Sequence, residues 1–170
     1  MIQIAVRLLF YVAVFVCFAA IGYIIWRGYK QRKVFFENQL SFCNHLLVEI
    51  SFSKNTVLHV IENYAQAYSL PFRQMLFNYK SLIDGKKDIT RESINSFMWR
   101  RLKPHERAIV ADFLYELGRH GPQQEREKIE NKKIQFDTFH QNAATALKKE
   151  ASIYLKVFIL LGVGAVVLLL

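Results

Sequence analysis

The chain has 170 residues, of which 52% are hydrophobic and 22% are charged, and its formal net charge is +9. A chain of this length holds one domain of moderate size between short terminal segments, which excludes an assembly of several folded domains. The two cysteines do not indicate a disulfide framework.

The first apolar stretch runs from Leu8 to Trp26, 19 residues without a charged side chain. It is long enough to cross a membrane as a helix. A secretory signal peptide is the alternative, but the stretch is long for the apolar part of a signal, and no small-residue cleavage site follows it. We therefore predict a membrane-spanning helix at residues 1–26 that stays in the mature protein.

A second apolar stretch occupies residues 153–170. At about 1.5 Å rise per residue it makes a rod of roughly 27 Å, close to one hydrocarbon thickness. Lys156 would lie near one interface, where its long side chain brings the ammonium group back to water. Small residues of the first span, namely Ala13, Cys17 and Ala20, are expected to receive Gly162 and Ala165 of the second span.

The basic residues gather beside the two apolar stretches. Arg7 precedes the first, and the domain side of the spans carries Arg27, Lys30, Arg32, Lys33, Lys148, Lys149 and Lys156. The remaining 15 basic and 13 acidic residues leave the middle of the chain at only +2. By the positive-inside rule, residues 27–152 are expected to form a cytoplasmic domain, with both termini on the opposite side of the cell membrane.

Apolar side chains recur at spacings of three and four along the middle of the chain, and no alternating run predicts a strand. The predicted fold class is all α: a cytoplasmic helical bundle built on two long antiparallel helices that continue into the two spans. The first long helix passes residue 50, with an apolar stripe made of Phe35, Phe36, Leu40, Cys43, Leu47 and Ile50. The second runs without a breaker from Gln123 to Gly162.

Shorter helices are expected between these two. Ser53, Asn55 or Thr56 would cap the first of them, Pro71 would open the next, and Gly85 would end it. Asp88 or Thr90 would cap a helix that carries four apolar side chains, Ile94, Phe97, Met98 and Leu102. Pro104 would open the last, which ends at the turn formed by Gly118, Gly121 and Pro122.

The sequence offers no catalytic, cofactor-binding or metal-binding motif, and we expect a protein that is not an enzyme and needs no cofactor. Asp112, Glu116 and His120 fall on one helical face and could in principle hold a metal. A polar stripe opposite Ile109 and Phe113 is the preferred interpretation.

Two places are predicted to contact a protein partner. One is a basic and aromatic patch, Trp99, Arg100, Arg101 and Lys103; the other is the bend, Leu117, Gly118, Gly121 and Pro122. A domain of +2 lacks the broad positive field of a nucleic-acid binder, so the patch is interpreted as a rim for an acidic protein neighbour. The alternative for both places is that they merely terminate helices.

The whole arrangement resembles the stage III sporulation protein AB family. The resemblance rests on the segment Leu46–Ile50, the segment from Glu106 to Gly118, the long helix with Glu125 and Ile129, and the terminal span containing Gly162, Val163 and Gly164. It implies a platform in the mother-cell membrane, part of the secretion-like channel complex of endospore formation, with a domain similar to the F-type platform domains of type II secretion and type IV pilus machines.

The partners that the resemblance implies are a cytoplasmic sporulation ATPase and other membrane proteins of the channel. Self-association into a homo-oligomer stays open. A membrane-tethered regulatory or sensor module is the alternative function.

Overall fold

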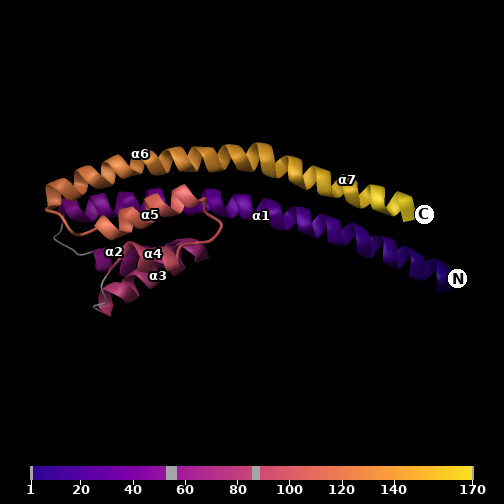
Figure 1. Ribbon diagram of the computed structural model, residues 1–170, viewed down its shortest axis with the longest axis horizontal. Coiled ribbons are helices and arrows are strands. Elements are labelled where there is room, and N and C mark those ends of the chain that lie inside the picture. Colours follow the sequence, from indigo (N-terminus) through magenta and orange to yellow (C-terminus); the bar gives the residue numbers. More distant parts are fainter. Residues whose placement is uncertain (1, 53–56, 86–88, 170) are drawn as a thin grey trace. The chain divides into compact units, whose positions relative to one another are not determined.

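The computed structural model describes residues 2–52, 57–85 and 89–169, and within these ranges it is helical without strands. The all-α prediction is confirmed. Figure 1 labels the α-helices in chain order: α1 (Ile2–Phe52), α2 (Val57–Tyr64), α3 (Leu70–Asp84), α4 (Arg91–Ser96), α5 (Pro104–Glu116), α6 (Pro122–Ala146) and α7 (Ser152–Leu169).

Contacts divide the chain into two units. Met1–Lys33 and Asn142–Leu170 form the paired-helix unit, and Val34–Gln141 form the bundle unit. Helix α1 contributes residues to both.

Both long helices of the paired-helix unit are long and apolar enough to cross a membrane. In each, only 6% of the most apolar 18-residue window is buried. The core helix of a soluble protein would bury most of such a window, so these apolar surfaces suit a lipid environment.

The two helices of this unit run antiparallel and approach closely at one glycine of each. A Cβ atom on Gly22 would lie 3.0 Å from the Cβ of Phe158, and one on Gly162 would lie 3.2 Å from side-chain atoms of Phe15 and Phe18. Small residues permit such close packing between membrane helices.

The prediction of which residues of the first span contact Gly162 was wrong. Ala13, Cys17 and Ala20 are exposed, and Gly162 packs instead against Phe15 and Phe18. The contacting residues Phe15, Phe18 and Gly22 lie one or two residues further along, which places them on roughly the opposite side of a helix of 3.6 residues per turn. Aromatic side chains together with Gly22, and not the stripe of small residues, form the contact face of α1.

The sequence predicted one uninterrupted helix for the second long helix, but the structure shows that it is not α-helical throughout. A π-helical turn, Leu147–Ala151, separates α6 from α7. The buried alanines on either side of the exposed residues Lys148 to Glu150 are Ala146 and Ala151, spaced by five residues. An α-helical stripe repeats after three or four residues, whereas a π turn bonds residues five apart, so this spacing favours the π turn.

Aromatic side chains dominate the core of the bundle unit. Phe35 is fully buried, with its ring centroid 5.1 Å from Phe72 and 5.7 Å from Trp99. The rings of Phe36 and Phe139 lie 5.4 Å apart and join α1 to α6. Such edge and stacked pairs stabilise a core beyond the area they bury.

The buried face of α1 includes Phe35, Phe36 and Cys43 of the predicted stripe but differs from it at other positions. Leu40, Leu47 and Ile50 are only partly buried, while Phe42, Leu46 and even Gln39 are fully or almost fully buried. Helix α1 is enclosed from several sides in the bundle, so its core-facing surface is broader than one apolar stripe.

Helix ends follow the sequence in part. The Thr90 side chain accepts a hydrogen bond from Ser93 N and caps α4 as predicted. Helix α4 ends at Ser96, earlier than expected, and Met98 and Leu102 are buried from turns. Pro104 accounts for part of this, because it disfavours an α conformation at residue 103. The other proposed caps, Ser53, Asn55, Thr56 and Asp88, lie outside the described residues.

Candidate docking site at the α5–α6 bend

The bend between α5 and α6 is shaped by one glycine and one glutamate. Gly118 follows the last turn of α5 with a φ of 80°, in the left-handed region that favours glycine. Its backbone N–H donates to Glu125 Oε1 at 2.8 Å. Glu125 lies in the first turn of α6, and its own N–H bonds to the carbonyl of Gly121 at 2.9 Å. The bend therefore has a specific geometry.

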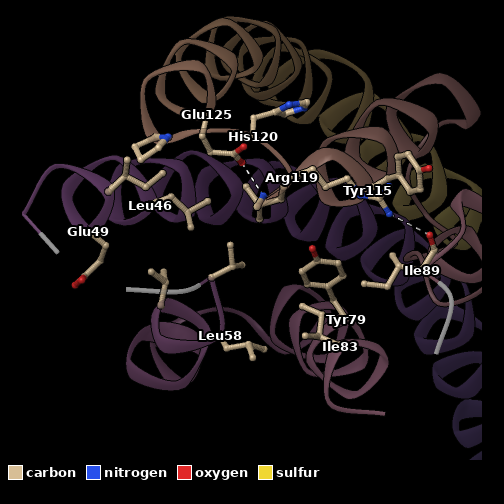
Figure 2. Close-up of a pocket in the computed structure, with 16 residues that line it drawn as sticks. Leu46, Glu49, Leu58, Tyr79, Ile83, Ile89, Tyr115, Arg119, His120 and Glu125 are labelled. Carbon is tan, nitrogen blue, oxygen red and sulfur yellow. Dashed lines mark hydrogen bonds between the residues drawn. The ribbon is translucent and has the colours of Figure 1, made fainter. Parts of the chain in front are cut away.

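A cavity of about 660 Å³ lies beside this bend, and we call it the bend cavity. Its apolar walls come from α1, α2, α3 and the segment that precedes α4, and include Leu46, Val57, Leu58, Tyr79, Ile83 and Ile89. Figure 2 shows these elements arranged around a common space, with Leu58 and Ile83 across from Glu125 in this view. Its size and apolar lining are typical of a binding pocket.

Glu49, Arg119 and Glu125 are acidic or basic side chains in the cavity lining, and of these three only Glu125 is buried. It is only 7% exposed, and its Oε2 atom is buried without a hydrogen-bond partner among the described residues. The N-terminal turn of a helix favours a carboxylate through the helix dipole. One oxygen of this buried carboxylate is therefore left without a donor by the described part of the chain.

The wall beside α4 is held by cation–π contacts. The Arg119 guanidinium lies 4.0 Å from the Tyr115 ring centroid, and that of Arg91 lies 5.2 Å from it. Arg119 also donates to the carbonyl of Ile89 at 3.4 Å. These contacts direct the Arg119 charge to the edge of the cavity.

The Tyr79 hydroxyl donates to the carbonyl of Leu114 at 2.8 Å and joins α3 to α5. Burial, with a smaller contribution from Glu125, raises the pKa of Tyr79 to about 12, although Arg119 acts in the opposite direction. The phenol is therefore neutral at physiological pH. Its hydrogen bond to Leu114 fixes Tyr79 in the wall of the bend cavity.

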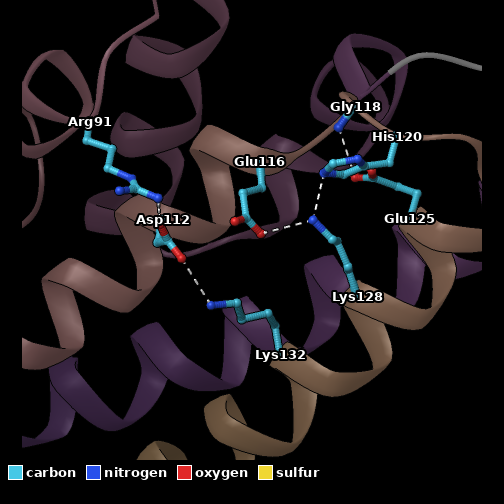
Figure 3. A network of polar contacts seen from close by, with 8 residues as sticks. All are labelled: Arg91, Asp112, Glu116, Gly118, His120, Glu125, Lys128 and Lys132. Carbon is cyan, nitrogen blue, oxygen red and sulfur yellow. Dashed lines mark hydrogen bonds and ion pairs between the residues drawn. The ribbon is translucent and has the colours of Figure 1, made fainter.

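Asp112, Glu116 and His120 take part in contacts between α5 and α6 (Figure 3). Asp112 pairs with Arg91 at 2.7 Å and with Lys132 at 3.3 Å. Lys128 lies 3.5 Å from Glu116 and 2.6 Å from His120 Nε2.

Lysines of α6 thus occupy the positions beside these carboxylates. In the part of the chain that the structure describes, no group of three or more His, Cys, Asp or Glu residues is arranged to hold a metal ion. The polar stripe serves to join two helices.

The basic patch differs from the bend in its surroundings. Trp99 is partly buried and stacks on Phe35, with an interplanar angle of 17°. Arg100, Arg101 and Lys103 are exposed, and the backbone N–H of Lys103 donates to Glu106 at the start of α5. None of these four patch residues lines the bend cavity. The patch and the cavity are therefore separate surfaces of the bundle unit.

Among the predicted bend residues, Leu117, Gly118 and Pro122 line the cavity, and Gly121 is exposed beside it. Glu125 was absent from the predicted contact set. Burial of one carboxylate oxygen depends on tertiary packing and has no local signature in the sequence.

The flanking cations differ in exposure. Arg27, Lys30, Lys148, Lys149 and Lys156 are exposed, whereas Arg32 is 7% exposed and Lys33 is partly buried. Lys30 lies over the Trp26 ring at 5.3 Å. Tyr29 donates to Glu150 at 3.1 Å and stacks on Tyr154. Aromatic rings and cations at one level of two apolar helices are typical of a membrane–water interface.

Comparison with known families agrees with this architecture. The model of the family described as stage III sporulation protein AB matches residues 7–170, which include both apolar helices and the whole bundle unit. No curated protein and no solved structure gave a match. With nearly its entire length matched, the chain belongs to the stage III sporulation protein AB family.

Proposed function

We propose that this chain is a non-enzymatic membrane platform of the secretion-like channel complex of endospore formation, where it links a cytoplasmic ATPase to membrane ring components. The observation that carries the proposal is the match to a sporulation family over residues 7–170. The matched region contains two helices long and apolar enough to cross a membrane and the helical bundle.

The construction of α1 supports a mechanical role. This helix has 51 residues and belongs to both units. A continuous helix keeps its backbone hydrogen bonds along its whole length, so a displacement of the bundle acts directly on the membrane helix. A platform of this kind needs rigid helices and contact surfaces, and no active site.

The absence of catalysis is part of the proposal. The family is not a known enzyme family. The polar residues that come closest to a catalytic or metal-binding arrangement, Asp112, Glu116 and His120, are paired with basic side chains. We also propose that no cofactor and no nucleic acid is bound.

The charge distribution supports the proposed orientation. Exposed cations of both helices flank the apolar stretches on the bundle side, which favours a bundle in the mother-cell cytoplasm and termini on the opposite side. The natural cysteines are poor reporters of sidedness, because Cys43 is buried and Cys17 lies within the first apolar stretch. Glu127→Cys places a thiol at an exposed position of α6.

In intact cells, an impermeant thiol reagent should leave Glu127→Cys unmodified until the membrane is permeabilised. Modification without permeabilisation contradicts the orientation.

Co-purification tests the platform role. Tagged full-length protein extracted from sporulating cells should bring down the cytoplasmic ATPase and further membrane subunits, and its deletion should block spore formation. Normal spore formation in the deletion strain contradicts the proposal.

A membrane-tethered regulatory or sensor module is the second candidate. The bend cavity favours it, since a cavity of about 660 Å³ with a buried acceptor can receive a small ligand. A regulator should purify alone or with a soluble effector, without the ATPase and the membrane subunits.

A further inference from the structure

We propose that the bend cavity is the docking site for an apolar segment of the partner protein that carries one lysine or arginine, whose charged nitrogen donates a hydrogen bond to Glu125 Oε2. The identification of that partner as the ATPase rests on the proposed function. The chemistry of the segment rests on the cavity alone.

Glu125 Oε2 is an acceptor that a hydrogen-bond donor from a partner would stabilise. A buried polar atom without a hydrogen bond is costly, and the cost is larger for a charged group. Gly118 N–H occupies only Oε1 of Glu125, and Oε2 is buried without a partner among the described residues. A cationic nitrogen is the strongest donor for it, because both members of the hydrogen bond are then charged.

The neighbouring cations are engaged elsewhere. Arg119 lies against the Tyr115 ring and donates to Ile89. Lys128 contacts Glu116 and His120. Neither forms an ion pair with Glu125, so among the described residues no cation completes this carboxylate, and a partner can supply one.

The walls define the rest of the ligand. Leu58, Ile83 and Ile89 line the cavity with apolar surface. Removing this surface from water is favourable when apolar groups of a ligand cover it. The cavity volume of about 660 Å³ accommodates a few large side chains and excludes a folded domain. An apolar segment with a single cation fits both the size and the charge.

This preference is opposite to that of the basic patch. Arg100, Arg101 and Lys103 expose three cations, which attract an acidic surface, whereas the bend cavity offers a buried carboxylate. Two separate surfaces of opposite charge preference on one bundle would fix the orientation of a docked partner.

A small probe tests the chemistry of the cavity. Full-length protein in lipid nanodiscs is titrated with 4-phenylbutylamine and with 4-phenylbutanol, while methyl NMR signals of Ile83 and Ile89 report site-specific binding. The amine should bind at least about tenfold more tightly than the alcohol, because a charge-assisted hydrogen bond contributes more than a neutral one. Equal binding of the two probes overturns the proposal.

Glu125→Gln should abolish this preference, because it removes the charge but keeps an acceptor for Gly118 N–H. Glu127→Gln, an exposed glutamate of the same helix, is the matched control and should retain the preference. Circular dichroism of both variants establishes that each one folds. Persistence of the amine preference in Glu125→Gln overturns the role of Glu125.

The partner is tested with the purified ATPase and the same nanodiscs. Its affinity should fall at least about tenfold for Glu125→Gln and stay unchanged for Glu127→Gln, and 4-phenylbutylamine should compete with it. If the ATPase binds Glu125→Gln as tightly as the natural chain, the docking site is wrong while the proposed function stands. If it does not bind the natural chain, the proposed function and the named partner are both contradicted, and the amine titration still decides the cavity chemistry.

Discussion

Replacing Gly118 by alanine isolates the backbone cost of the α5–α6 bend. Gly118 has a φ of 80°, and the nearest neighbour of an added Cβ atom is Val57 Cγ2 at 3.7 Å, an ordinary van der Waals distance. The methyl group therefore meets no steric obstacle, and the cost comes from the left-handed conformation itself. That cost is about 1–2 kcal/mol for a residue other than glycine.

Trp99 supplies the assay, because it stacks on Phe35 in the core of the bundle unit. In a Trp26→Phe background it is the sole tryptophan of the chain. Urea unfolding of the full-length protein in detergent micelles, followed by Trp99 fluorescence, should show a loss of about 1–2 kcal/mol for Gly118→Ala.

Gly121→Ala is the control, since a Cβ atom at Gly121 has no neighbour within 4 Å and its φ is not positive. It should change the free energy of unfolding by less than about 0.5 kcal/mol. Equal effects of the two substitutions, or no effect of Gly118→Ala, would refute the left-handed bend.

Three further predictions follow from the packing. Burial raises the pKa of the Cys43 thiol to about 12, so iodoacetamide should modify it slowly at neutral pH in the folded protein and rapidly after unfolding; fast modification of the folded protein contradicts the core. Desolvation lowers the pKa of His45 below 6.5, against a smaller upward effect of Glu49, so the unfolded chain binds the proton more tightly. The contribution of neutral His45 to the free energy of unfolding should be complete above pH 6.5 and should decline as the pH falls below it. In urea unfolding at several pH values, His45→Gln should make this decline smaller. Gly22→Leu should separate the paired helices and lower the yield of bis-maleimide cross-linking between cysteines introduced at positions 29 and 154. Gly164→Leu is the control and should leave the yield unchanged, because a Cβ atom at Gly164 has no neighbour within 4 Å.

Helix type and helix ends were predictable where the signal is local. Pro104 opens α5, Gly118 lies in the turn that follows it, and Thr90 caps α4, each for a reason contained in a few neighbouring residues. Prediction failed where the outcome depends on a partner. The face of α1 that meets Gly162 was assigned by residue size, yet packing selected Phe15 and Phe18.

The π turn is an intermediate case. Its signal, a spacing of five from Ala146 to Ala151, is present in the sequence, but it becomes readable only when burial is known. The same holds for the core face of α1, where Gln39 is fully buried although a polar side chain predicts exposure.

The sequence by itself determined the helical class, the two apolar stretches, the concentration of cations beside them and the family resemblance. These properties depend on composition and short-range periodicity, which one chain displays without its partners. The tertiary structure alone decided which carboxylates pair with cations and which carboxylate oxygen is buried without a partner among the described residues. Asp112 and Glu125 are both acidic residues of the bundle unit, but Asp112 pairs with Arg91 and Lys132, whereas Glu125 Oε2 is buried without a hydrogen-bond partner among the described residues.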